Sequence, residues 1–256
     1  MSLFISSVFT YDEDAGNYIQ AVETADAQAL EPATRKAINN FVIGCKQDGI
    51  WTAIKASCIL AGARTLAGAL VPLVGTAPTN NGFIGIGTDY VRKTGLVGDG
   101  STKYLDSNRA GNADPQNNQH ISIFMSSAPV TGSTRYVIDS GFGSAGTSAI
   151  LTSGSGTFVK SQNSTADTPS SSKQTGFHGV ARSVSASYTA RVTGKTTLFS
   201  RVSQTPTSQE FLLYSSANGT RADARLAFYS IGEAIDLALL DARITDLINA
   251  FAVTIP

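Results

Sequence analysis

The N-terminal part of the chain has apolar residues at the spacing of α-helices. They recur over 18–22, over 37–45 and again over 50–59, with the period that marks one face of a helix. Pro32 opens the second stretch, and proline suits the first helical position because its missing N–H needs no partner there. We therefore expect two or three short helices in an N-terminal segment, residues 1–62, which also contains a strand over 3–10.

The middle of the chain, residues 63–229, has short alternating or β-branched runs bounded by Gly, Asn, Asp, Ser or Pro. The run 185–192 alternates without a break, as a half-buried strand does. Many short strands without intervening helices indicate an antiparallel β-sandwich of the jelly-roll kind, and the polar stretch 161–173 is expected to be a solvated loop. The predicted strands are 65–74, 83–86, 103–105, 121–125, 135–138, 148–151, 157–160, 177–183, 185–192, 196–202, 210–215 and 226–229.

The last segment, residues 230–256, returns to a helical pattern. Ser230 and Glu233 have the spacing of a capping box, in which each side chain accepts from the other residue's backbone N–H. The apolar face of this C-terminal helix must cover either the sheet of its own chain or a neighbouring chain. We take this face and the strand over 3–10 as candidate assembly elements of an oligomer, with a trimer as the hypothesis. The candidate assembly residues on the helix are Ile235, Leu239, Ile244 and Leu247.

Charge is scarce and balanced in this chain. Lys and Arg together number 19, as do Asp and Glu, and charged residues make up 15% of the sequence. A general nucleic-acid-binding protein needs a basic excess to neutralise phosphates, so we expect no nucleic acid as a partner. No apolar run reaches the roughly 18 residues of a membrane-spanning helix, and the start lacks the basic residues of a signal peptide. We expect no membrane insertion.

Few residues are suited to hold a metal or to act as nucleophiles. Cys45 and Cys58 lie in apolar surroundings, which predicts buried, reduced thiols and synthesis in a cytoplasm. His120 and His178 have no Cys, His or carboxylate at a metal-ligand spacing, so we expect hydrogen-bonded structural histidines. We therefore predict no catalytic residues, no metal and no cofactor.

The acids give little support to an enzyme. A glycosidase needs two carboxyl groups about 5 Å or about 6.5–9.5 Å apart, facing one bond. No two acids fall in one predicted strand at the even spacing that places both on one face. The oxygen-rich segment 95–120 favours local turns, with a calcium-binding or sugar-contacting loop as the alternative. The calcium candidates in this segment are Asp99, Asp106 and Asp114.

Three tyrosines in or beside predicted strands are candidate glycan-binding residues: Tyr90, Tyr104 and Tyr136. A tyrosine ring can stack on the face of a sugar while its hydroxyl forms a hydrogen bond. The alternative is the ordinary role of a strand tyrosine, which packs one apolar face against its neighbours.

Three long runs, over 41–79, 92–109 and 224–251, resemble a module of tailed-bacteriophage structural proteins. This module is a concanavalin-A-like (LamG-like) jelly roll with added helices, and the similarity extends over about 12–251. The resemblance implies a non-catalytic virion protein in a tail fibre, spike or baseplate appendage, assembled in the host cytoplasm. The implied partners are other virion proteins, copies of the chain and host-surface glycan.

Two alternatives remain open at this point. Only about ten residues precede the module, whereas many relatives carry it at the end of a longer fibre, so the chain is alternatively a capsid decoration or cement protein. An enzyme that degrades surface polysaccharide, a glycosidase or a lyase, is the alternative from another functional class.

Overall fold

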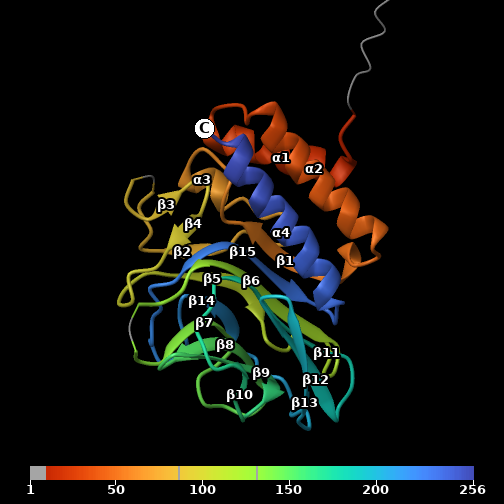
Figure 1. Cartoon of the computed structure of the whole chain (residues 1–256), viewed down its shortest axis with the longest axis vertical. Helices are drawn as coiled ribbons and strands as arrows, with labels where there is room; N and C mark the ends of the chain where they lie inside the picture. Colours follow the sequence, from red (N-terminus) through yellow and green to blue (C-terminus); the bar gives the residue numbers. More distant parts are fainter. Residues whose placement is uncertain (1–9, 86, 131) are drawn as a thin grey trace, which may run out of the picture.

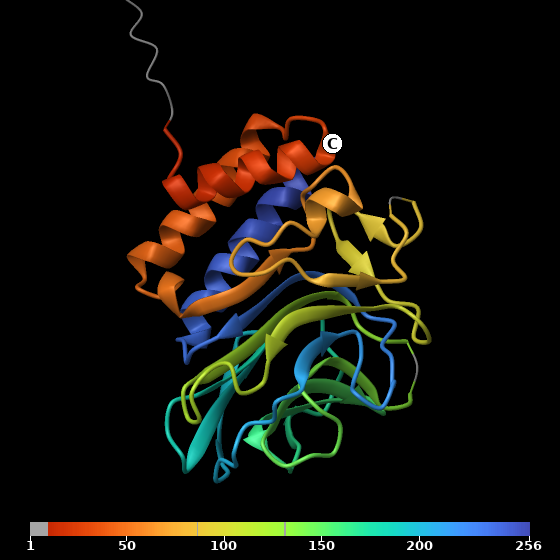
Figure 2. The same cartoon turned by 180° about the vertical axis from the view of Figure 1, so that it is seen from behind.

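The structure, a computed structural model, describes residues 10–85, 87–130 and 132–256. The strand predicted over 3–10 therefore lies outside the described residues, apart from Thr10. The chain forms three layers, with helices on one sheet and a second sheet beyond it (Figure 1). Figure 2 shows the same order of layers from behind. One sheet has eight strands and the other has seven. This confirms the prediction of a mainly β protein built on an antiparallel sandwich.

The eight-stranded sheet has the strand order β13-β12-β11-β6-β15-β4-β3, with β1 paired to β15. Its strands are β1 (Ile54–Ile59), β3 (Tyr90–Val91), β4 (Gly95–Val97), β6 (Gln119–Ser127), β11 (Gly176–Arg182), β12 (Ser187–Val192), β13 (Lys195–Ser200) and β15 (Arg225–Gly232). The seven-stranded sheet has the order β10-β9-β8-β7-β14-β5-β2. Its strands are β2 (Thr79–Asn81), β5 (Tyr104–Ala110), β7 (Arg135–Asp139), β8 (Thr147–Ser153), β9 (Gly156–Asn163), β10 (Asp167–Ser170) and β14 (Glu210–Leu213).

The helices cover the face of the eight-stranded sheet that is turned away from the other sheet (Figure 1). Asp12 caps the first helix by accepting from the backbone N–H of Asp14, and Pro32 opens the second as predicted. No helix of the described residues is both long and apolar enough to cross a membrane. The helices are α1 (Glu13–Asp26), α2 (Pro32–Gln47), α3 (Leu66–Ala69) and α4 (Leu237–Thr254), with a 3-10 turn η1 (Trp51–Ala53).

Strand register separates the two faces of the seven-stranded sheet. One cross-strand row lies in the hydrophobic core between the sheets and consists of Leu105, Leu213, Ile138, Ile150 and Val159. Successive side chains of a strand point to opposite faces, so the next row faces away from the core. This second row consists of Asp106, Leu212, Asp139, Ala149 and Lys160. We call the face that carries it the outer face.

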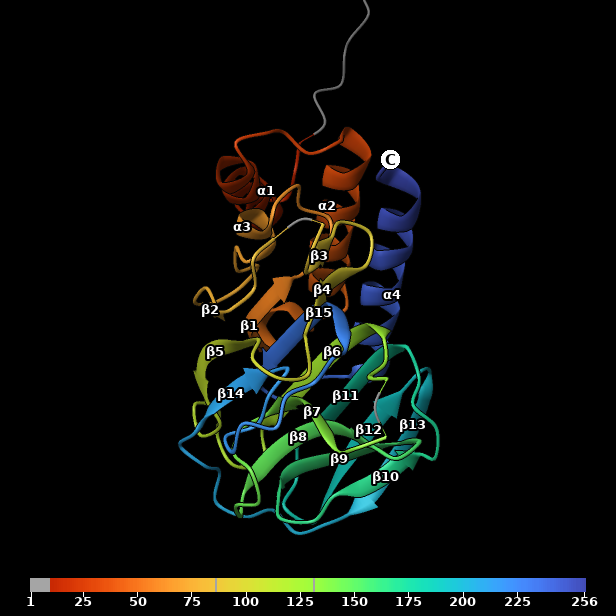
Figure 3. The same cartoon turned by 90° about the vertical axis from the view of Figure 1, so that its left-hand side faces the viewer.

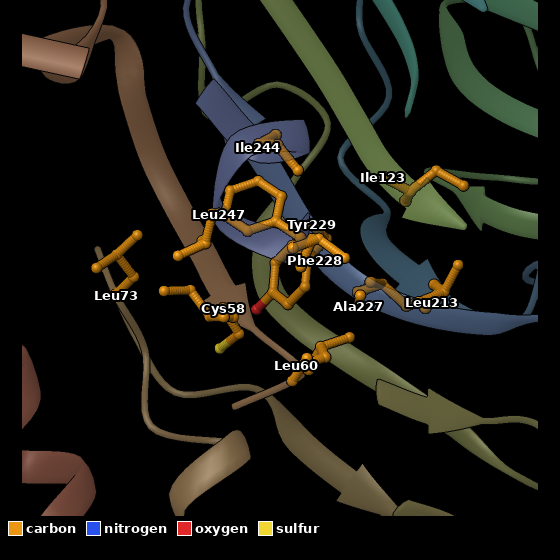
Figure 4. Packing of buried hydrophobic residues seen from close by; sticks show 14 of the residues in the cluster. Cys58, Leu60, Leu73, Ile123, Leu213, Ala227, Phe228, Tyr229, Ile244 and Leu247 are labelled. Carbon is orange, nitrogen blue, oxygen red and sulfur yellow. The ribbon is translucent and has the colours of Figure 1, made fainter. Parts of the chain in front are cut away.

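The predicted assembly face of the C-terminal helix is used inside the chain. Ile244 and Leu247 are fully or almost fully buried, and Figure 4 shows them among side chains of β1 and β15, such as Cys58 and Phe228. The helix therefore covers its own sheet, and Ile244 and Leu247 are not available to a neighbouring chain. Of the other two candidates, Ile235 is partly buried against the core, and 38% of Leu239 is exposed.

The helix predicted over 50–59 is wrong. Its apolar residues form η1 and then β1, which pairs with the central strand β15. Four of the six residues of β1 in succession, from Ala56 onward, are buried. A strand buried on both faces is apolar throughout, and such a run is easily mistaken for one side of a short helix.

Three further local predictions are corrected. The strand expected over 65–74 is the short helix α3 followed by a loop, because the Thr65 hydroxyl caps the N–H of Gly68. The segment 161–173 is not all loop, since it completes β9 and forms β10. Ser230 lies in β15 rather than at a helix start, and Asp236 is the residue that caps α4.

Candidate functional site

The three candidate tyrosines have different environments. Tyr90 is 1% exposed, and its hydroxyl donates to the Ala63 carbonyl at 2.7 Å, so it is a core residue and the glycan-binding prediction is wrong for it. Tyr104 and Tyr136 both belong to the outer face, on β5 and β7. Strand β14 lies between these two strands, which places the two tyrosine backbones about 10 Å apart.

Tyr104 already has a cation on its ring. The Arg221 guanidinium lies over it at 4.3 Å from the ring centroid, and the same group donates to the Ser215 hydroxyl. A cation–π contact of this kind occupies one face of the aromatic ring. Tyr104 is therefore half-buried and has at most one ring face left for a ligand.

Tyr136 belongs to an aromatic patch on the outer face. The Phe142 ring, from the loop after β7, meets the Tyr136 ring edge-on at 5.6 Å between centroids. Tyr136 is only 8% exposed, whereas 45% of Phe142 is exposed. The exposed aromatic ring at this place is thus Phe142, which lies outside every predicted strand. We define the aromatic patch as Tyr136, Phe142, Leu151 and Phe158.

A second group on the outer face is polar and buried. Lys160 on β9 donates to the Thr147 hydroxyl on β8, with 2.7 Å between Nζ and Oγ1. Within the described structure, the Asp139 carboxylate and the Asn163 carboxamide have no hydrogen-bond partner for either of their polar atoms. None of the four residues is more than 4% exposed. We call Asp139, Thr147, Lys160 and Asn163 the outer polar cluster.

The charges of this cluster affect each other without forming an ion pair. Burial raises the pKa of Asp139 to about 6, although the Lys160 charge and nearby backbone N–H groups oppose this rise. Burial also lowers the pKa of Lys160, against the attraction of the Asp139 charge. Both shifts follow from the cost of holding a charge away from water without full hydrogen bonding.

Two loops cover the outer polar cluster. A Cβ added at Gly141 would lie 3.3 Å from the Thr147 methyl group, so the loop backbone rests on the cluster. The Gln204 backbone N–H donates to the Gln162 carbonyl at 2.7 Å, and the Gln204 side chain accepts from the Gly146 N–H at 3.2 Å. The loops over 140–146 and 203–206 therefore meet above the ends of β8 and β9.

Two acids converge on the outer face across strands rather than along one strand. Asp106 on β5 lies next to Glu210 on β14, and the favourable sharing of a proton with Asp106, burial and the Asp106 charge together raise the pKa of Glu210. A pair at hydrogen-bonding distance leaves no room for a glycosidic bond between its carboxyl groups. The pair escaped the sequence analysis because that analysis compared acids within single strands.

The three calcium candidates do not form a metal site. Asp99 closes a turn by accepting from the backbone N–H groups of Ser101, Thr102 and Lys103. Burial raises the pKa of Asp99, but these hydrogen bonds and that of the Thr102 hydroxyl outweigh it, so the pKa is lowered. Among residues 10–85, 87–130 and 132–256, no three His, Cys, Asp or Glu side chains could hold a metal ion together.

The remaining two candidates are engaged elsewhere, since Asp114 pairs with Arg109 and Asp106 with Glu210. The calcium prediction is therefore wrong, and the turn interpretation holds for Asp99.

The histidines and cysteines are structural. His120 is fully buried between the Ser230 hydroxyl at 2.7 Å and the Glu233 carbonyl at 2.6 Å. Burial lowers its pKa to about 4. His178 is also fully buried, and its Nε2 lies 3.0 Å from the Gln174 carbonyl. Cys45 and Cys58 are free and buried, as predicted.

Two surface hollows lie away from the outer face. One, of about 350 Å³, is lined by polar residues that include Ser170, Gln174 and Lys195. The other, of about 370 Å³, is a groove between α2 and α4 that Phe41, Gly44 and Arg243 help to line. Neither hollow contains two converging carboxyl groups, although the groove includes Asp246.

Comparison with known proteins shows the fold. No protein-family model matches the sequence, and no curated protein matches it. The binding domain of botulinum neurotoxin serotype D is similar in structure, with 9% identity, a TM-score of 0.52, and coverage of 76% of this chain and 51% of that chain.

Two more solved structures are similar at the same level. The receptor binding domain of botulinum neurotoxin mosaic serotype C/D has 8% identity and a TM-score of 0.50, covering 76% of this chain and 50% of that one. A Trypanosoma rangeli sialidase in complex with sialic acid has 9% identity and a TM-score of 0.50, covering 77% and 34%. The chain thus spans about half the length of the toxin structures it matches.

Proposed function

We propose that this chain is a non-catalytic glycan-binding module, and that the outer face of its seven-stranded sheet is the binding surface. The observation that carries the proposal is the exposed Phe142 ring, which rests on Tyr136 beside buried polar groups that lack partners. An aromatic ring next to polar side chains suits a sugar, which has apolar ring faces and polar edges. Two solved structures of similar fold add support: the receptor binding domain of a botulinum neurotoxin and a sialidase in complex with sialic acid.

The absence of catalysis is part of the proposal. The Asp106–Glu210 pair is too close to flank a glycosidic bond, which favours a binding role over a glycosidase. The polysaccharide-degrading enzyme is the alternative, and incubation with bacterial surface polysaccharide tests it. We expect no new reducing ends and no unsaturated products. Release of either kind of product by the wild type, and loss of release in Glu210→Gln, would contradict the proposal.

A glycan array tests the binding role. We expect the fluorescently labelled chain to bind a subset of glycans, and Phe142→Ala to weaken this binding by roughly tenfold, because a stacked ring contributes about 1 kcal/mol or more. Val253→Ala is the matched control, since Val253 is an exposed apolar residue of α4, away from the outer face. Equal binding by wild type and Phe142→Ala would exclude the aromatic patch as the binding surface.

The virion location is proposed from the sequence resemblance to phage structural modules. We place the chain in a tail fibre, spike or baseplate appendage, with a capsid decoration protein as the alternative. Antibody labelling of purified particles by electron microscopy tests this, with label expected on the tail. Label on the head would favour the decoration protein, and unlabelled particles that lack the chain would refute a virion role.

Assembly as a trimer stays a prediction. The apolar surface available for it is smaller than the sequence indicated, because Ile244 and Leu247 are buried within the chain. Leu239 is still 38% exposed, and Ile235 lines a shallow hollow with Val184 and Leu198. We expect light scattering coupled to size exclusion to give three times the mass of 26.7 kDa. A single-chain mass at micromolar concentration would count against it.

A further inference from the structure

The outer polar cluster is an unusual feature for the interior of a protein. Buried polar atoms almost always have a hydrogen-bond partner, and those that lack one call for an explanation such as a missing ligand or water. Here no hydrogen bond of ordinary geometry reaches either oxygen of Asp139 or either polar atom of Asn163, although nearby backbone N–H groups lie close enough to the Asp139 carboxylate to lower its pKa. Lys160 has three N–H donors, and a single hydrogen bond, to Thr147, is formed. The cluster thus holds several donors and acceptors that the chain itself does not satisfy.

The donors and acceptors of the cluster determine which kind of ligand could form the missing hydrogen bonds. Asp139 in its ionised form accepts only, Lys160 donates only, and the Asn163 carboxamide does both. A hydroxyl group both donates and accepts at one oxygen, so adjacent hydroxyls of a sugar can donate to Asp139 and accept from Lys160. This is the hydrogen-bonding pattern of a sugar with vicinal hydroxyls.

The charge of the surroundings selects against an acidic sugar. Asp139 and Lys160 together are neutral, so the cluster offers no net attraction to a carboxylate. Asp106 lies in the same cross-strand row as Asp139, with Leu212 between them, and Glu210 lies next to Asp106. This acid pair adds negative charge to the row that contains Asp139 and disfavours an anionic ligand there, whereas the positive charge of Arg221 is held on the Tyr104 ring.

The loop over 140–146 provides a route to the cluster. Gly141, Gly143 and Gly146 all have positive φ, and the tip at 142–145 is exposed. The tip is held to the neighbouring loop through the Gly146–Gln204 hydrogen bond and to the sheet through the Phe142–Tyr136 contact. Displacing it would expose Asp139 and Lys160, whose charged groups gain hydration when uncovered.

We propose that the outer polar cluster is a subsite for a neutral sugar with vicinal hydroxyls, and that the loop over 140–146 moves aside to admit it. The proposal rests on the proposed function and specifies its ligand. Phe142 then stacks on the bound sugar, while Asp139, Lys160 and Asn163 bind its hydroxyls. The end of the strand β7 and the strands β8 and β9, which lie side by side in Figure 3, form the rigid floor of the subsite.

Calorimetric titration tests the subsite with two probes, the methyl glycosides of neutral hexoses and sialyllactose. We expect the wild type to bind at least one neutral glycoside more tightly than sialyllactose. Lys160→Met removes a charged hydrogen-bond donor to the sugar, and Thr147→Val removes the hydroxyl that positions Lys160. Each variant should weaken that binding by roughly tenfold. Hydrogen exchange at 140–146 should slow when the glycoside is bound.

Asp114→Asn is the matched control. It alters a buried acid outside the cluster, where Asp114 pairs with Arg109, and it should leave glycoside binding unchanged while lowering stability.

Tighter binding of sialyllactose than of every neutral glycoside would overturn the choice of ligand. If Lys160→Met and Thr147→Val change stability but not binding, the cluster holds only structural water and the subsite is refuted, although Phe142→Ala can still confirm the binding face. Failure of the wild type to bind any glycan on the array would refute the proposed function itself.

Discussion

Two buried histidines and one buried carboxyl group set the pH dependence of stability. Burial lowers the pKa of His120 and His178 to about 4, from an ordinary 6.5. Their contribution to stability is complete above pH 6.5 and is lost as the pH falls toward about 4. The raised pKa of Asp139, about 6 instead of 3.8, acts in the opposite sense, because protonation of this carboxyl favours the folded state.

We predict that the free energy of unfolding falls between pH 7 and pH 5. Each of the two histidines accounts for a loss of about 2 kcal/mol, and Asp139 for a gain of about 1 kcal/mol, so the net loss is about 3 kcal/mol. Urea unfolding at the two pH values measures it. His178→Gln should reduce the pH dependence by roughly the share of one histidine. A free energy of unfolding that is the same at pH 5 and pH 7 would be inconsistent with two neutral buried imidazoles.

Arg182 is a buried arginine that ties several strands together. It is fully buried and donates to backbone carbonyls that include Ser161 on β9 at 2.7 Å and Arg201 at 2.9 Å. It also lies 5.3 Å from the centroid of the Tyr188 ring. A charged residue in a strand was not recognised as part of the core, because sequence patterns treat arginine as a surface residue.

We expect Arg182→Met to lower the free energy of unfolding by about 3 kcal/mol or more, since several buried carbonyls lose their donor at once. Chemical denaturation measures the change. Lys195→Met is the control on the exposed strand β13, and it should change stability by less than about 0.5 kcal/mol. A loss below about 1 kcal/mol for Arg182→Met would indicate that water replaces the guanidinium at little cost.

At the scale of elements, α4 is a structural part of the monomer. It packs on α2 and on the sheet, with Leu247 2% exposed and Leu239 38% exposed. Leu247→Ala should therefore cost about 2–5 kcal/mol, as a cavity in a packed core does, whereas Leu239→Ala should cost less than about 1 kcal/mol. Thermal and urea unfolding compare the two. Equal costs would mean that the two sides of α4 are packed alike.

The sequence predicted most elements but fewer of their mutual positions. The helices α1 and α2 and most strands of the sandwich follow from local periodicity and from Gly, Pro and Asp at their ends. The strand β1 was missed because a fully buried strand has no alternation, and the shortest strands β3 and β4 have too few residues to show one.

The candidate site depended on register, which local patterns do not encode. Tyr104 and Tyr136 were chosen as glycan-binding candidates and Asp106 as a calcium candidate, yet all three lie on the outer face. Asp139 and Lys160, which no motif marked, meet there because their strands pair with the two edges of β8. Phe142 was missed because it lies in a glycine-rich loop that has no strand pattern.

At the scale of the whole molecule, the three layers assign different roles to the two sheets. The helices bury one face of the eight-stranded sheet, and the two sheets bury their facing sides, so the outer face is the remaining sheet surface without a layer over it (Figure 1). Short loops rather than helices cover part of it. This arrangement places the aromatic patch and the outer polar cluster at the end of the molecule away from the helices.

The most direct test of the account is a nuclear magnetic resonance titration of the isotope-labelled chain with the best-binding neutral glycoside. The account predicts shift changes confined to β7, β8, β9 and the loop over 140–146, with the largest at Phe142 and Gly143. Changes confined to the polar hollow at Ser170 and Lys195, or to the groove between α2 and α4, would contradict the claim that the outer face binds glycan.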